Sequence, residues 1–259
     1  MSFKRISAGL IFLTILLTIS LSINIFQNKS SILGISFAKP AQISKTIVLV
    51  GDSMTEYLGN FELLNLALKK HYPNTTFQLL NYGFGSTNIL SVPDRLTKLS
   101  DYNKRLLQPI NDIPFDLILI ESTGNNPLSQ YSLEEGTKKQ NQTLDQIVSI
   151  IIQKHPKSSI VFVATIAPNK DWYGYGALTL SPQQREQWVN ERIAYIKNHM
   201  AYAKLHNIPL INIFDKSLDS TGQGNIDYLN SNDHIHPSPT GIEFISKEIA
   251  NFIFKYKLF

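Results

Sequence analysis

Short apolar runs, separated by longer amphipathic stretches, dominate the chain from Thr46 onward. The runs are TIVLV (46–50), FQLLNY (77–82), DLILIES (116–122), SIVFVATIA (159–167) and PLINIF (209–214). Their nearly continuous hydrophobicity is typical of parallel strands that are covered on both faces. The pattern therefore predicts five parallel strands.

The stretches between these runs have the apolar spacing of helices. Residues 56–70 and 143–154 each carry apolar residues on one helical face: Leu58, Phe61, Leu64 and Leu68 in the first, and Leu144, Val148 and Ile151 in the second. Ser181-Pro182 and Ser238-Pro239 are start signals for a helix to about residue 206 and for a last helix near the end of the chain. Strands alternating with helices predict an open α/β sheet in a single domain, residues 45–259.

The N-terminal segment has a different character. Lys4 and Arg5 precede the uncharged stretch 6–26, which is long enough to span a bilayer and longer than the apolar core of most secretory signals. We expect residues 1–26 to form an uncleaved signal anchor, a transmembrane helix, with a cleaved signal peptide as the alternative. Positive charge before the segment predicts an extracytoplasmic domain. Residues 27–44 are irregular and are interpreted as a linker.

Composition narrows the function classes. The 259 residues include no cysteine, which excludes disulfides, thiolate metal sites and a cysteine nucleophile. The net charge is +4, and the basic residues are scattered among acidic ones rather than gathered into a run with aromatic residues. Nucleic acid is therefore not expected as a partner.

Polar and glycine-containing loops follow the first three predicted strands. They are Gly51-Asp52-Ser53, NYGFGSTN (81–88) and ESTGNNP (121–127). In open parallel sheets the ligand site lies outside the carboxyl ends of the strands, so these loops are expected to form it. We expect Asp52 to accept hydrogen bonds from nearby backbone and so to shape its turn.

Two of the six histidines, His234 and His236, lie in a loop just before the last predicted helix. Asp233 precedes His236 by three residues, an offset that in a tight turn brings its carboxylate to the imidazole Nδ1–H. A solvated polar turn without a catalytic role is the alternative. The other four are interpreted as surface or helix-capping residues: His71, His155, His199 and His206.

Taken together and in this order, the four motifs resemble the SGNH (GDSL-type) hydrolase superfamily over about residues 46–256. The resemblance implies a three-layer α/β/α fold with a five-stranded, flavodoxin-like parallel sheet, and catalysis without a metal or cofactor. By resemblance, Ser53 is the nucleophile and Asp233 and His236 complete a catalytic triad.

The resemblance also implies an oxyanion hole. Its donors are the Ser53 backbone N–H, the Asn126 side-chain amide and a backbone N–H of the second loop, at Gly85 or Ser86 depending on alignment. Pro127 stands where the family usually has an aspartate, a residue that oxyanion donation does not require.

We therefore expect a serine esterase that acts through an acyl-enzyme on an extracytoplasmic lipid or O-acylated glycan. An acyltransferase using the same residues is an open alternative. A metallophosphoesterase is a further reading of the GDS, GNN and HIH motifs, but too few ligands are present for two metals. A catalytically inactive binding module is the last alternative, and the complete Ser/Asn/Asp/His set argues against it.

Aromatic residues follow the fourth predicted strand in NKDWYGYGALTLS (169–181). Trp172, Tyr173 and Tyr175 are candidates for lining the substrate cleft, where they would stack on sugar rings. Ordinary packing over the edge of the sheet is the alternative.

Overall fold

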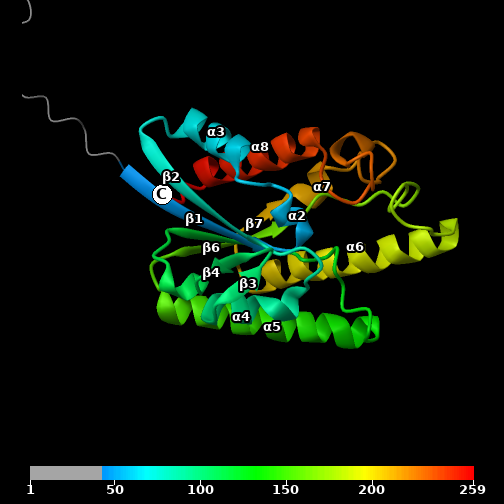
Figure 1. Ribbon diagram of the computed structural model, residues 1–259, viewed down its shortest axis with the longest axis horizontal. Coiled ribbons are helices and arrows are strands. Elements are labelled where there is room, and N and C mark those ends of the chain that lie inside the picture. Colours follow the sequence, from blue (N-terminus) through cyan, green and yellow to red (C-terminus); the bar gives the residue numbers. More distant parts are fainter. Residues whose placement is uncertain (1–42) are drawn as a thin grey trace, which may run out of the picture. The chain divides into compact units, whose positions relative to one another are not determined.

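The computed structural model describes residues 43–259, and a five-stranded parallel sheet lies at their centre (Figure 1). The strands are β1 (Ile43–Gly51), β2 (Thr75–Gly83), β5 (Leu117–Glu121), β6 (Ser159–Ala164) and β7 (Leu210–Asn212). Their order is β2-β1-β5-β6-β7. Counted along the chain, this is the flavodoxin-like order 2-1-3-4-5. The predicted five parallel strands are confirmed.

Helices cover both faces of this sheet and complete a three-layer fold (Figure 1). The helices are α2 (Ser53–Glu56), α3 (Glu62–His71), α4 (Val92–Thr97), α5 (Leu133–Lys154), α6 (Pro182–Leu205), α7 (Ile213–Lys216) and α8 (Pro239–Lys255). One apolar cluster joins α3 and α8 to the sheet, and a second joins α4, α5 and α6 to it. The predicted α/β/α layering is therefore confirmed.

Strand β1 shows why the apolar runs are continuous rather than alternating. Ile47 and Leu49 belong to the cluster under α3 and α8, whereas Val48 and Val50 belong to the cluster under α4, α5 and α6. All four side chains are buried. A central strand covered on both faces needs apolar residues at every position.

The helix boundaries differ from the predicted ones in two places. The predicted helix 56–70 is two helices, α2 and α3, separated by a turn in which Gly59 and Phe61 have positive φ. Helix α5 begins at Leu133, ten residues before the predicted start. Ser132 caps it by accepting a hydrogen bond from the Glu135 N–H. The first turns of α5 are polar, so they lack the apolar spacing that indicates a helix.

A small hairpin was not predicted from the sequence. Strands β3 (Ser100–Tyr102) and β4 (Arg105–Leu107) pair antiparallel outside the main sheet. Asn103 and Lys104 form the two-residue turn, and both have positive φ, as type I′ hairpin turns require. The hairpin brings Tyr102 and Asn103 to the edge of the sheet where the predicted site lies.

The predicted signal anchor, residues 1–26, lies outside the described residues, as does most of the predicted linker. Strand β1 begins at Ile43, two residues before the predicted start of the domain. No helix within residues 43–259 has both the length and the hydrophobicity of a membrane span.

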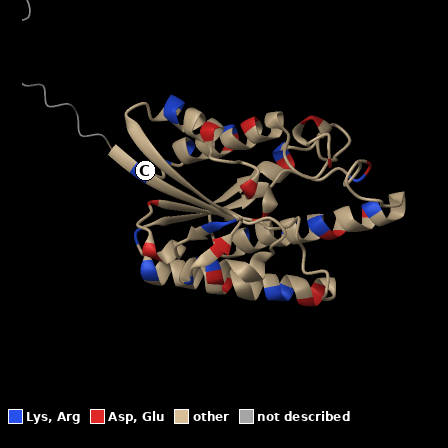
Figure 2. Cartoon of the chain, viewed as in Figure 1, with Lys and Arg blue, Asp and Glu red and all other residues tan. Residues whose placement is uncertain are grey.

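Charged side chains of both signs are interspersed along the outer helices. In the view of Figure 2, basic and acidic segments alternate along α5 and α6. This mixture is the pattern of a solvated surface rather than of a continuous basic face.

Strand order places the predicted site. β1 pairs with β2 on one side and with β5 on the other. The chain adds β2 on one side of β1 and the later strands on the other, so the strand order switches between β1 and β5. The loops after β1 and β5 leave the same edge there. This junction is where open α/β sheets bind their ligands.

Candidate active site

Ser53 is the first residue of α2, directly beyond the end of β1. The turn between them is tight: a side chain at Gly51 would lie 2.1 Å from Thr55 Oγ1 and 2.6 Å from Glu121 Oε2. As expected, Asp52 caps the helix, and its Oδ1 accepts a 2.8 Å hydrogen bond from the Met54 N–H. The sequence Gly-Asp-Ser thus turns the chain sharply and sets Ser53 at the edge of the sheet.

A buried arginine fixes the neighbouring strand ends. Arg95 from α4 is 2% exposed, and its Nη1 donates to the carbonyl oxygens of Gly51 (2.6 Å) and Tyr82 (2.8 Å). Burial lowers the pKa of Arg95 to about 10, so the guanidinium still carries its charge at neutral pH. It therefore ties the ends of β1 and β2 together beneath the site.

The loop before α8 brings His236 to Ser53. His236 Nε2 lies 3.0 Å from Ser53 Oγ, and His236 Nδ1 lies 2.8 Å from Asp233 Oδ2. The other oxygen of Asp233 accepts the backbone N–H groups of Ile235 (2.8 Å) and His236 (3.0 Å). One carboxylate therefore holds both the turn and the imidazole, which leaves Nε2 facing the serine.

Asp233 is ionised in this setting. Burial by itself would raise its pKa, but the hydrogen bonds from the His236 side chain and from the backbone of Ile235 and His236 outweigh burial and lower it. The acceptor for the Nδ1–H is therefore a carboxylate. That arrangement fixes the tautomer in which Nε2 is free to accept a proton.

Tyr57 packs face to face on the His236 imidazole. The ring centroids are 3.9 Å apart and the rings are nearly parallel, at 2°. Tyr57 follows Ser53 by one turn of the chain at the end of α2. This stacking limits rotation of the His236 imidazole about its Cβ–Cγ bond and so keeps Nε2 directed at Ser53.

Asn126 reaches the same edge from the loop after β5, and its side-chain amide donates to Asp52 Oδ2 (3.0 Å). An amide nitrogen carries two hydrogens, so this bond fixes the orientation of the group and leaves a second N–H for another acceptor. Asn126, Ser53 and His236 line the same cavity.

Beneath Asn126 lies a pair of buried carboxyl groups. Asp52 is completely buried and Glu121, the last residue of β5, is 6% exposed. The Asp52 backbone N–H donates to Glu121 Oε2 (3.2 Å), and Glu121 Oε1 accepts from Ser122 Oγ (2.7 Å) and the Thr123 N–H (2.9 Å). Burial raises the pKa of both acids. The charge of Asp52 raises the pKa of Glu121 further, well above its usual value. We therefore describe Asp52 as the carboxylate and Glu121 as the neutral acid.

We expect the free energy of unfolding of Glu121→Gln, compared with that of the wild type, to increase as pH rises. A carboxyl group with a raised folded-state pKa keeps its proton in the folded state, while the unfolded state loses it above its ordinary value of 4.5. Stability then falls by up to about 1.4 kcal/mol per pH unit until the folded-state pKa is reached. Glutamine cannot ionise. Urea unfolding between pH 4 and pH 8 should show the free energy of unfolding of the variant gaining on that of the wild type as pH rises.

The difference in slope is the informative quantity in that experiment. Glutamine places an amide where Glu121 Oε2 accepts the Asp52 N–H, which costs a fixed amount at every pH. A difference between the two proteins that stays constant from pH 4 to pH 8 would contradict the assignment of the proton to Glu121.

The loop after β2 supplies a third group of residues. The Gly85 N–H donates to Glu56 Oε2 (2.9 Å) and to the Tyr102 hydroxyl (2.7 Å). Glu56 also accepts from Tyr102 (2.8 Å) and from the Asn103 amide (3.0 Å). Ser86 follows with a positive φ of 59°. Of the two predicted backbone donors in this loop, Gly85 is already engaged by Glu56 and Tyr102.

A cavity of about 750 Å³ opens over these groups, and Ser53, Ser86, Asn126 and His236 line it. Of the three aromatic residues predicted to line the cleft, Tyr173 does so and is 2% exposed. Trp172 and Tyr175 are about half exposed and pack instead around His234, at ring distances of 5.3 and 6.0 Å.

One of the remaining histidines differs from the expectation. His199 was expected at the surface or at a helix cap, but it is completely buried in α6 and stacks on Phe162 at 4.4 Å. Burial lowers the pKa of His199 to about 3, so it is neutral at physiological pH. Residues 43–259 contain no group of three or more histidines and acids that is arranged to hold a metal ion.

The model of the GDSL-like lipase/acylhydrolase family matches residues 49–243, about three quarters of the chain. The chain belongs to this family. The match begins within β1 and ends within α8, so it includes all the loops described above. The protein is accordingly a hydrolase of ester bonds.

Solved structures with the same fold include three enzymes of low sequence identity. An acetyl xylan esterase has 14% identity and a TM-score of 0.54, with 80% of this chain and 98% of that chain covered. A GDSL-like lipase from Bacteroides thetaiotaomicron has 16% identity and a TM-score of 0.50, with 82% and 89% covered. A gut microbial diltiazem-metabolizing enzyme has 14% identity and a TM-score of 0.56, with 83% and 48% covered. A search of curated proteins found no match.

Several residues of this GDSL-like site were not identified from the sequence. They are Glu56, Tyr57, Arg95, Tyr102, Glu121, Trp188 and Arg192. The sequence does mark Glu121, because an acid ends an otherwise apolar strand. It also marks Trp188 and Arg192, because they are four residues apart on one helix and therefore share a face. The others depend on contacts between segments that are distant in sequence.

Proposed function

We propose that the protein is a serine esterase that hydrolyses carboxylic esters through an acyl-enzyme. The observation that carries this proposal is the unbroken line of contacts from Ser53 Oγ to His236 Nε2 (3.0 Å) and from His236 Nδ1 to Asp233 Oδ2 (2.8 Å). A serine hydroxyl is a weak nucleophile unless a base within hydrogen-bond reach accepts its proton. The line ends in a cavity with room for a substrate.

In this mechanism, Ser53 Oγ attacks the ester carbonyl carbon while His236 Nε2 takes the hydroxyl proton. Asp233 stabilises the imidazolium that forms, and the stacked Tyr57 ring keeps it in place. His236 then gives the proton to the departing alcohol oxygen, which leaves the acyl group on Ser53. A water molecule, deprotonated by His236, releases the acid and restores the serine.

The oxyanion of the tetrahedral intermediates needs donors that are already in position. We assign the Ser53 backbone N–H, the second N–H of the Asn126 amide and the Ser86 backbone N–H to this role. Ser86 is preferred to Gly85 because the Gly85 N–H already donates to Glu56 and Tyr102. Asp52 acts through Asn126: by accepting its first N–H it directs the second at the reacting carbonyl.

Labelling with a fluorophosphonate tests the proposal directly. This reagent phosphonylates only a serine that is activated by a base, so we expect one adduct per chain, located at Ser53 by peptide mass spectrometry, with parallel loss of p-nitrophenyl acetate hydrolysis. A chelator should leave the rate unchanged. Full activity after exposure to the reagent, combined with inhibition by the chelator, would instead support a metallophosphoesterase and refute the serine mechanism.

The physiological ester is proposed to be an acylated lipid or an O-acylated glycan outside the cytoplasm. Support comes from the apolar stretch 6–26 after Lys4 and Arg5, which favours a membrane anchor with the domain on the outer side. Protease treatment of intact cells should degrade the domain, and deletion of residues 1–42, which leaves β1 intact, should move it to the soluble cytoplasmic fraction. A domain that is protected from protease in intact cells would refute this location.

Transfer of the acyl group to a sugar would use the same acyl-enzyme. The ratio of free acid to acylated sugar, measured with and without a glycan acceptor, distinguishes the two outcomes. Hydrolysis predicts that free acid remains the main product when the acceptor is present.

A further inference from the structure

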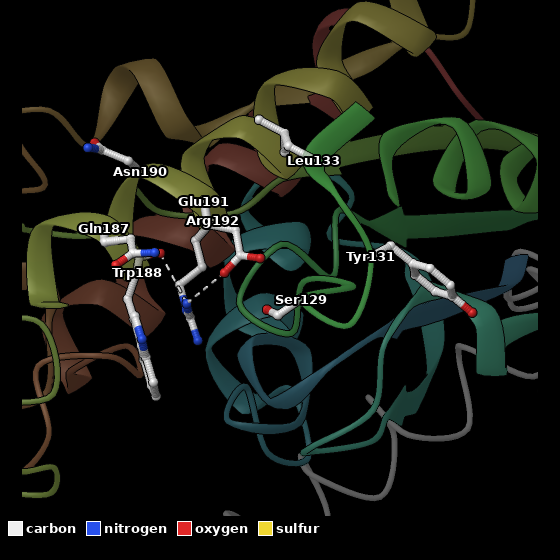
Figure 3. Close-up of a pocket in the computed structure, with 8 residues that line it drawn as sticks. All are labelled: Ser129, Tyr131, Leu133, Gln187, Trp188, Asn190, Glu191 and Arg192. Carbon is white, nitrogen blue, oxygen red and sulfur yellow. Dashed lines mark hydrogen bonds and ion pairs between the residues drawn. The ribbon is translucent and has the colours of Figure 1, made fainter. Parts of the chain in front are cut away.

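Arg192 stands in a wall that the active-site cavity shares with a second cavity. This second cavity has a volume of about 760 Å³ and lies between α6 and the loop before α5. Trp188 and Arg192, one turn apart on α6, line both cavities. Figure 3 shows both side chains extending from α6 in the same direction, with Ser129 facing Arg192 across the second cavity.

The guanidinium of Arg192 is held between aromatic rings. It lies 4.9 Å from the centroid of Trp188 and 5.0 Å from that of Tyr173. Nη1 donates to the Trp188 carbonyl oxygen at 3.0 Å. The side chain is only 11% exposed. The geometry therefore fixes a positive charge in the wall of the active-site cavity, held by two aromatic rings and by one long ion pair to Glu191.

Within residues 43–259 no carboxylate is hydrogen-bonded to this charge. The nearest recorded acid oxygen is Glu191 Oε2, 3.9 Å from Nη1, and Nε is buried without a partner. The acid that lines the cavity is Glu56, and its carboxylate already accepts from Gly85, Tyr102 and Asn103. A largely buried guanidinium whose ion pair is as long as 3.9 Å has lost hydration that a closely bound anion would restore.

We propose that Arg192 binds the carboxylate of an acidic sugar in an O-acylated glycan substrate. The inference rests on the proposed esterase function and specifies its substrate class. An arginine fork matches a carboxylate through two parallel N–H···O bonds, which gives strong and geometrically specific binding. Arg192 and Ser53 line the same cavity, so one sugar chain could place its carboxylate at Arg192 and its ester at Ser53.

Features of the lining favour a glycan over an anionic lipid. Besides Asn126, which is assigned to the oxyanion hole, the amides of Asn103 and Asn125 line the active-site cavity, and amides suit hydroxyl groups better than an acyl chain. Trp188 is 38% exposed next to the cation, and exposed indole faces stack on sugar rings. Two open cavities on either side of Trp188 and Arg192 provide space for sugar units in sequence along a chain.

A pair of matched substrates tests this proposal. Mono-O-acetylated methyl glucuronoside and the corresponding mono-O-acetylated methyl glucoside differ only at C6, which is a carboxylate in the first and a hydroxymethyl group in the second, and acetate release gives kcat/KM for each. We expect the full-length enzyme to prefer the glucuronoside by roughly 10- to 100-fold, the range of one charge-assisted pair. Arg192→Gln should reduce the preference to about one, and Arg192→Lys should retain part of it.

Lys197→Gln is the matched control, because it removes one positive charge from an exposed position on the same helix. It should leave the preference unchanged. If wild type hydrolyses both sugars equally, or if Arg192→Gln lowers both rates by the same factor, the acid-binding role is wrong while the esterase function stands. If p-nitrophenyl acetate is not hydrolysed either, the esterase function itself fails and the inference fails with it.

Dihexanoyl phosphatidylglycerol forms the third arm of the experiment. Should Arg192→Gln selectively lower hydrolysis of this anionic lipid, without a carboxylate preference among the sugars, the glycan assignment would be overturned in favour of a phospholipid.

Discussion

Ser53→Ala is expected to reduce ester hydrolysis by roughly 10⁴-fold or more. The reaction as proposed has no covalent intermediate without the serine oxygen, and His236 loses the group whose proton it accepts. What catalysis remains would come from oxyanion donors and substrate positioning alone. Steady-state hydrolysis of p-nitrophenyl acetate, with purified protein of verified mass, measures the loss.

Folding controls make that result interpretable. The Ser53 side chain has one recorded hydrogen bond, to His236, so its removal should leave the thermal unfolding midpoint nearly unchanged. Ser149→Ala, which changes an exposed serine on α5, should retain wild-type activity. Turnover by Ser53→Ala at the wild-type rate would refute the nucleophile assignment.

Asp233→Asn is expected to lower kcat by roughly 10³- to 10⁴-fold with a smaller change in KM. The amide oxygen of asparagine can still accept the N–H groups of Ile235 and His236, so the turn should persist. The amide nitrogen, however, would face His236 Nδ1 as a donor. That contact favours the tautomer with the proton on Nε2, which cannot accept a proton from Ser53.

Asp219→Asn provides the comparison for Asp233→Asn. Asp219 is also a loop acid that accepts hydrogen bonds within its own turn, from Thr221 and Gln223, and none of these three residues lines the active-site cavity. Its amide variant should keep nearly full kcat. Equal rates for the Asp233→Asn variant and the wild type would mean that the carboxylate does not set the tautomer of His236.

Much of the site followed from the sequence because of how parallel sheets are built. The carboxyl ends of parallel strands share one edge, so Ser53 after β1 and Asn126 after β5 had to leave the same side of the sheet. The offset between Asp233 and His236 is local, and a turn of that length brings the two side chains together. These local signals predict two pairs, Ser53 with Asn126 and Asp233 with His236, and the resemblance to the GDSL-type hydrolases joined the pairs into one predicted site.

The supporting residues were not predictable in the same way. Tyr57 meets His236 across 179 residues of sequence, and Tyr102 reaches Gly85 only because a short hairpin, unseen in the hydrophobic pattern, folds over the edge of the sheet. Helix α5 was predicted too short because the residues that its first three turns bury, Gly136, Gln140 and Thr143, are not apolar. Contacts of this kind depend on tertiary packing, on which local pattern carries little information.

The separation between Ser53 and His236 has a consequence for the enzyme during its synthesis. The two residues that touch at 3.0 Å are 183 positions apart. At a synthesis rate of about 5–20 residues per second, the ribosome makes the base roughly 10–40 s after the nucleophile. A growing chain therefore carries an unactivated serine for most of its time on the ribosome. Esterase activity, measured on chains released at increasing lengths, would report the moment at which the two ends of the domain first dock.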